Sequence, residues 1–148
     1  MGMFDSMAIS GSGLTAQRYR MDIIAENLAN IDTTRTEDGT PYRRKVVTFE
    51  ERTDKTEFSS MLNLATKQYN GQGVRVGKVE EDTWTEMVKA YDPSHPDADE
   101  NGYVWYPNVN TVTEMVDLID ASRSFEANAT AFDASKSMMT KALNMGMS

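Results

Sequence analysis

The amino-acid sequence predicts an α+β fold in which long N- and C-terminal helices pair as a coiled-coil-like hairpin, with a small β-rich insert between them. Apolar residues recur at seven-residue steps near each end of the chain. This spacing is typical of helices that pack along one stripe. In the middle of the chain apolar and polar residues alternate in short runs, which predicts strands.

The C-terminal arm, residues 111–144, predicts a single helix. Its length of about 35 residues is roughly two to three times that of an ordinary globular helix. Thr111 and Glu114 match the T-x-x-E pattern of a capping box at the start of this helix. The seven-residue row, with the residues that widen it, consists of Leu118, Phe125, Phe132 and Met139 with Val112, Met115, Ile119, Ala129 and Leu143. A row of this length predicts that the helix packs against a partner.

The N-terminal arm, residues 4–31, carries the same seven-residue step. Its row consists of Met7, Leu14, Met21 and Leu28, with Ile24 and Ile31 beside it. The run Ser10-Gly11-Ser12-Gly13 interrupts this arm, and glycine inside a helix costs roughly 1 kcal/mol relative to alanine. Either the helix begins near Leu14, or the small residues let another backbone approach closely. Asn30 is a plausible C-cap.

The middle of the chain predicts four strands, at residues 42–51, 74–79, 84–91 and 103–106. Residues 53–70 are polar and predict a loop or a short helix. The expected organisation is a discontinuous helical domain, residues 1–34 and 109–148, and a β-rich insert with loops, residues 35–108.

Composition excludes several classes of function. A net charge of −8 argues against nucleic-acid binding through a basic surface. No apolar run is long enough for a membrane span, and no secretory signal pattern opens the chain. The absence of cysteine excludes disulfides, thiol catalysis and cysteine-bound metals.

The negative charge is concentrated in one segment. Residues 80–120 hold eleven acids and one base, whereas the rest of the chain is slightly basic. The simplest interpretation is a solvated face. The alternative is that this segment meets Arg43, Arg44 and Lys45 of a neighbouring copy.

Candidate chemistry is sparse. His95 is the only histidine, and no nucleophile or orienting group is suggested by spacing. Residues 97–102 match the first half of a calcium loop, but Asn108 stands where the bidentate acid is needed. We therefore expect no catalytic, cofactor-binding or metal site, and no enzyme activity.

Two stretches resemble the terminal signatures of bacterial flagellar rod and hook proteins. At the N-terminus the resemblance covers SGLTAQRYRMDIIAENLANIDTT, residues 12–34, around the run NLAN at residues 27–30. At the C-terminus it covers NTVTEMVDLI, residues 110–119, and SRSFEAN, residues 122–128. Residues 35–44 and 91–104 resemble the proximal rod proteins in particular.

The resemblance implies a structural, non-enzymatic subunit of the flagellar proximal rod that is needed for motility. Such proteins send both terminal helices into the wall of an axial tube, beside copies of themselves and other flagellar rod proteins. They leave the cell through the flagellar type III export apparatus without a cleaved signal and reach the basal body, where the rod spans the periplasm. Their terminal arms tend to be disordered in the monomer and helical in the assembly.

The seven-residue rows and three asparagines are the expected partner interface. Its residues are Met7, Leu14, Met21, Ile24, Asn27, Leu28, Asn30, Val112, Met115, Leu118, Ile119, Phe125, Asn128, Phe132 and Met139. The asparagines are expected to fix the register of the helices by side-chain hydrogen bonds, like a polar residue in a coiled-coil seam.

Two other functions remain open from the sequence. A free-standing binding or adaptor module with a helical-hairpin handle would be a stable monomer outside any larger assembly. A hydrolase acting through the acidic loop around His95 would lose activity in His95→Ala, although no spacing supports it.

Overall fold

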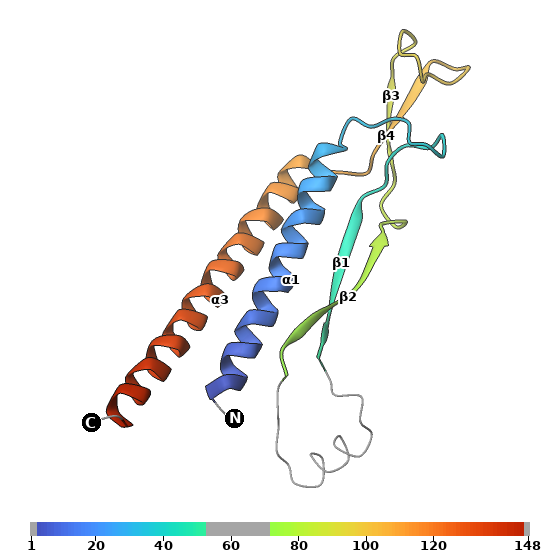
Figure 1. Cartoon of the computed structure of the whole chain (residues 1–148). Helices are drawn as coiled ribbons and strands as arrows, with labels where there is room; N and C mark the ends of the chain where they lie inside the picture. Colours follow the sequence, from blue (N-terminus) through green and yellow to red (C-terminus); the bar gives the residue numbers. More distant parts are fainter. Residues whose placement is uncertain (1–2, 53–71, 147–148) are drawn as a thin grey trace, which may run out of the picture. The chain divides into compact units, whose positions relative to one another are not determined.

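A computed structural model describes residues 3–52 and 72–146 of the chain. The elements follow the order α1 (Met3–Ala29), β1 (Lys45–Glu51), β2 (Val74–Glu81), β3 (Val88–Tyr91), β4 (Tyr103–Tyr106) and α3 (Thr111–Gly146), as Figure 1 shows. The predicted α+β class, with a helix at each end and strands between, is confirmed. The prediction of a loop or short helix at 53–70 lies outside the described residues.

Contacts divide the chain into two compact units. The first contains Met1–Tyr19, Thr48–Gly77 and Ala121–Ser148, and the second contains Arg20–Val47 and Lys78–Asp120. Each unit therefore holds part of both long helices. The division into a helical domain and an insert stays a prediction.

In the first unit, α1 runs without a break through its glycine-rich stretch. Gly13 is buried, and a Cβ on it would lie 2.8 Å from Oδ1 of Asn128 on α3. A side chain at this position would collide with the other helix, so Gly13 permits close approach. Farther along the pair, the Ser6 hydroxyl donates a hydrogen bond to the Ser135 hydroxyl at 3.3 Å. Of the two interpretations of this stretch, close approach is confirmed.

The same stretch of α1 also holds the start of β2. The Ser12 hydroxyl accepts a hydrogen bond from the Val74 N–H at 3.0 Å and donates to the Ile9 carbonyl at 2.6 Å. Gly73 has a φ of 95°, and a Cβ there would overlap the Ser12 hydroxyl. Glycine is therefore required at this turn by both backbone conformation and space.

The strands form two separate two-stranded sheets, β1–β2 and β3–β4. β3 and β4 are antiparallel, with Val88 opposite Tyr106 and Tyr91 opposite Tyr103, and they lie side by side in Figure 1. Side chains of β1 alternate between partly exposed and exposed, as its sequence pattern predicts. The strand expected at 84–91 begins only at Val88, because the residues before it form a tight turn.

Asparagines cap the helices. The Asn110 side-chain oxygen accepts hydrogen bonds from the N–H groups of Val112 (3.0 Å) and Thr113 (3.2 Å), so Asn110 is the N-cap of α3. The predicted capping box of Thr111 and Glu114 is therefore wrong, because the Glu114 side chain is engaged elsewhere. At the end of α1, the backbone N–H (3.1 Å) and the side-chain amide (2.9 Å) of Asn30 both donate to the Glu26 carbonyl, so Asn30 closes the last turn of the helix.

The centre of the second unit is polar. Asn27 on α1 is 1% exposed, and both the nitrogen and the oxygen of its side-chain amide form hydrogen bonds. Its nitrogen donates to Glu114 Oε2 (3.1 Å) and to the Lys45 carbonyl (2.9 Å). Its oxygen accepts from the Tyr42 hydroxyl and the Lys45 N–H, both at 2.9 Å. One side chain thereby ties α1 to α3, to β1 and to the loop before β1.

Arg44 neutralises the buried carboxylate at this centre. Glu114 is 0% exposed, and its Oε1 accepts a hydrogen bond from Arg44 Nε at 2.6 Å. Arg44 also pairs with Asp117 (3.4 Å) and Asp82 (3.9 Å), and Arg20 pairs with Asp117 at 2.9 Å. A buried ion is stable only when it is paired and hydrogen-bonded in this way.

Buried apolar residues are few and mostly small. Among the described residues they are Ala16, Ile24, Tyr42, Val104, Val109 and Ala121. Most fully buried positions on the two helices are therefore alanine, glycine, serine or hydrogen-bonded side chains, whereas the large apolar rows, apart from Ile24, are only partly covered.

Removing one partner of the Arg44–Glu114 pair should destabilise the fold more than removing both. Glu114→Leu should cost less than Arg44→Met, because Arg44 keeps Asp117 and Asp82 as partners. Arg44→Met leaves the buried Glu114 carboxylate without a cation and is expected to lower the unfolding free energy by about 3–5 kcal/mol. The double variant should recover at least half of that loss. Urea unfolding of all four proteins measures the coupling, and additive losses would contradict it. A single variant that fails to fold beside a folded double variant supports it.

Burial, with the carboxylates of Glu26 and Glu114 nearby, raises the pKa of the Tyr42 hydroxyl to about 12 from its ordinary 10.0. Because the folded pKa lies above the unfolded one, this contribution to stability is complete below pH 10 and disappears as the pH rises from 10 to 12. The loss should reach about 2–3 kcal/mol. Unfolding measured across that pH range should show a shallower decline in Tyr42→Phe. An equally steep decline in the variant would contradict the assignment.

Candidate assembly interface

The first turns of α3 are amphipathic, but here a polar residue is buried and the apolar residues are exposed. Glu114 points inward and is fully buried, whereas Val112 is 71% exposed and Ile119 is 52% exposed. Met115 and Val116 are also exposed, and the spacing of these four residues places them on one helical stripe. We call them the α3 apolar stripe. A soluble helix normally presents the opposite pattern, so this stripe is a candidate surface for another chain.

The predicted interface residues on α1 differ in how far they are buried. Ile24 and Asn27 are buried within the second unit. Partly exposed positions are Met7, Leu14, Met21, Leu28 and Asn30. Asn30 acts in the cap described above.

On α3 the remaining predicted residues are neither fully buried nor fully exposed. They are Leu118, Phe125, Asn128, Phe132 and Met139. The Asn128 amide donates to the Ser124 carbonyl of its own helix at 2.8 Å and lies against Gly13. Within the described residues, Asn27 alone of the three predicted asparagines forms a side-chain hydrogen bond between the helices.

The residues that hold the helices together were largely missed by sequence reasoning. They include Glu114, Ala121 and Ser135 on α3, which are buried. A signal was present, since Glu114, Ala121, Asn128 and Ser135 repeat at seven-residue steps. The residues of that row are small or polar, whereas the predicted interface consists mainly of large apolar residues.

The basic residues expected to meet a neighbour's acidic segment are partly engaged within the chain. Arg44 binds Glu114, and Lys45 Nζ lies 2.5 Å from Glu26 Oε1. Arg44 and Lys45 therefore already have partners in their own unit, and pairing of the basic residues with a neighbouring copy stays a prediction. Several acids of the segment have partners in their own unit.

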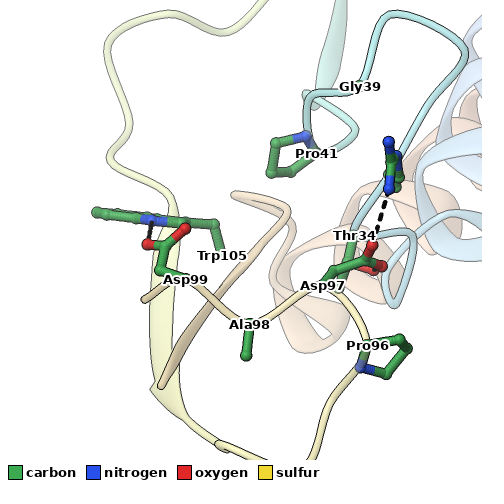
Figure 2. Close-up of a pocket in the computed structure, with 9 residues that line it drawn as sticks. Thr34, Gly39, Pro41, Pro96, Asp97, Ala98, Asp99 and Trp105 are labelled. Atoms are coloured by element: carbon green, nitrogen blue, oxygen red, sulfur yellow. Dashed lines mark hydrogen bonds and ion pairs between the residues drawn. The ribbon is translucent and has the colours of Figure 1, made fainter. Parts of the chain in front are cut away.

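A surface pocket of about 300 Å³ lies among the loops of the second unit. Figure 2 shows Asp97 beside Thr34, and Asp99 beside the Trp105 indole. The Thr34 hydroxyl donates to Asp97 at 2.9 Å, and the Trp105 N–H donates to Asp99 at 3.1 Å. Asp97 and Asp99, two acids of the loop that partly matches a calcium site, therefore accept hydrogen bonds from protein groups.

His95 supports the turn beside this pocket. Its Nδ1 accepts the Asp97 N–H at 3.1 Å, and its ring meets Tyr106 edge-on. Within residues 3–52 and 72–146, no three histidine or acidic side chains are grouped so that they could hold a metal ion. No helix in these ranges is long and apolar enough to span a membrane.

Family comparisons agree with the terminal signatures. Residues 7–35 match the model of the flagella basal body rod protein family. Residues 100–145 match the model described as flagellar basal body rod FlgEFG protein C-terminal.

Relatives match along nearly the whole chain. The flagellar basal-body rod protein FlgC of Bacillus subtilis is 46% identical, over 99% of each chain. Its counterpart in Borreliella burgdorferi is 47% identical over 97% of each chain, and that of Salmonella typhimurium is 41% identical over 99%. The chain therefore belongs to the FlgC family of flagellar basal-body rod proteins, and it is a structural rod subunit and not an enzyme.

Proposed function

We propose that this subunit builds the proximal rod by packing its terminal helices against copies of itself and against other rod proteins. The α3 apolar stripe is the observation that carries this proposal. Four large apolar side chains face outward while a glutamate faces inward. This arrangement is stabilised when a neighbouring subunit covers the stripe. Burying such a side chain contributes about 1.5–3 kcal/mol when it moves from full exposure.

The remaining predicted interface residues extend this surface along both helices. Partly exposed Leu14 and Met21 on α1, and Phe125 and Phe132 on α3, retain apolar area that a neighbour can cover. Contacts of this kind join two different patches, so successive subunits continue as a tube rather than closing into a pair. In this proposal residues 1–34 and 109–148 act as the rod-forming domain and residues 35–108 as the insert.

Delivery to the basal body is part of the same proposal. The subunit is exported by the flagellar type III apparatus without cleavage of a signal and is assembled where the rod crosses the periplasm. Helices joined by small and polar residues separate without exposing a large apolar core, which suits a chain that travels before it assembles.

Charge placed on the α3 apolar stripe should block assembly without unfolding the subunit. Met115→Asp combined with Ile119→Asp is expected to abolish incorporation into tagged, purified basal bodies and to stop swimming, because an assembled neighbour would bury both carboxylates. Thr113→Asp, an exposed position near the same helix start, is the matched control and should assemble. Circular dichroism of the monomers should be unchanged. Normal rods from the double variant would rule out the stripe as an interface.

Order in the isolated subunit should be greatest around the polar centre. Hydrogen exchange of the monomer is expected to be slow near Asn27 and Glu114, whose surroundings are buried, and fast over residues 136–145, where most side chains are exposed. Assembly should slow exchange at that end. Slow amides throughout both helices of a monomer would contradict the proposal that neighbours complete their order.

A further inference from the structure

Trp84 is the most exposed large apolar side chain in the described ranges, at 94%. It lies in the short connection between β2 and β3, outside both long helices. Neither of the two matching family models covers this residue, and the packing of the helices does not use it. Hydrogen bonds formed by two side chains fix the connection that carries Trp84.

The Asp82 side chain closes the turn around Trp84. Its Oδ1 accepts the N–H groups of Trp84 (3.0 Å) and Thr85 (3.1 Å), and its Oδ2 accepts the Thr85 hydroxyl at 2.8 Å. These hydrogen bonds, the Thr85 hydroxyl first, lower the pKa of Asp82 below its ordinary value. One carboxylate therefore closes the turn through three hydrogen bonds.

Asn108 fastens this turn to the body of the second unit. It is 6% exposed, and its amide donates to the carbonyls of Asp82 (2.9 Å) and Thr85 (3.2 Å). Its oxygen accepts the Arg44 N–H at 2.8 Å, and the Asp82 N–H donates to the Arg44 carbonyl at 2.7 Å. The backbone that presents the indole is thus fixed to the residue that neutralises Glu114.

The flanks of Trp84 are acidic. Glu80, Glu81 and Glu86 are all exposed, and residues 78–89 hold four acids against two bases, Lys78 and Lys89. Lys78 pairs with Glu80 at 3.6 Å, so within the described residues Glu81 and Glu86 are the exposed acids on either side of the indole that carry unpaired charge. The apolar ring therefore lies in a segment of net negative charge. The complementary surface has an apolar cleft with basic residues around it.

We propose that Trp84 anchors a contact with a different rod protein, inserting its indole into an apolar cleft rimmed by lysine or arginine. This inference rests on the proposed assembly into a rod. A more basic rod protein fits better than a second copy, because this chain has a net charge of −8 and its Arg20, Arg44 and Lys45 are engaged in their own ion pairs. The turn is fixed before binding, so little ordering entropy is lost. Tryptophan is also enriched among residues that dominate binding energy.

A photo-crosslinking amino acid at position 84 of the full-length protein tests the partner. In purified basal bodies it should join a different rod protein at a site with lysine or arginine nearby in sequence. A crosslink to a second copy, or none, overturns the inference. The same label at position 115 is the control: its crosslinking shows that rod assembly itself occurred, so failure at 84 alone leaves the proposed function standing.

Affinity for the crosslinked rod protein, once purified, tests the anchor. Trp84→Ala should weaken binding by roughly 20- to 30-fold, the effect of a strong hot spot. Glu81→Gln with Glu86→Gln should weaken binding and its salt dependence, whereas Glu100→Gln, an exposed acid in another loop, should change neither. Because Trp84 is almost fully exposed, the variants should retain the unfolding transition of the parent. Binding within twofold of the parent for Trp84→Ala overturns the inference.

Discussion

The buried carboxylate of Glu114 is the constraint on which the second unit depends. It receives a hydrogen bond from Asn27 on one helix and from Arg44 beside β1, so two helices and a strand meet at one ion. Charged groups tolerate burial only with near-complete pairing, so displacement of any partner is expected to disturb the others. Arg44 extends the network to Asp82, and through Asn108 to the turn of Trp84. Positions distant in sequence are in this way held as one polar structure.

Sequence periodicity predicted both helices and the approximate strands, because repeating patterns report which element a segment forms. It did not predict which face of each helix turns inward. The buried positions on α3 are Glu114, Ala121 and Ser135, and none of them belongs to the large apolar row. The burial of Glu114 depends on Asn27 and Arg44, which lie 87 and 70 residues away in sequence. Long-range hydrogen bonds of this kind leave no local pattern, so the sequence predicted a bonding role for Asn27 but neither Glu114 as its partner nor the pairing of Glu114 with Arg44.

The inverted start of α3 links this packing to the role of the family. A monomeric protein would gain stability by turning Val112 and Ile119 inward and Glu114 outward. This chain does the reverse, with its polar contacts inside and its apolar side chains available. Hydrogen bonds determine how α1 and α3 pair within the chain. The exposed apolar side chains remain available to neighbouring subunits. A structural rod subunit needs both, since it must fold in one way and still bind many surfaces.

The polar junction between the helices also has a mechanical consequence. Apolar side chains can slide past one another with little loss, because dispersion and hydrophobic contacts have no preferred direction. Hydrogen bonds such as Asn27 to Glu114 weaken steeply once their geometry is disturbed. Gly13, with Asn128 seated against it, adds a steric stop to movement along the helix axis. A helix pair joined in this way resists shear, which is the load that torque places on the wall of a turning shaft.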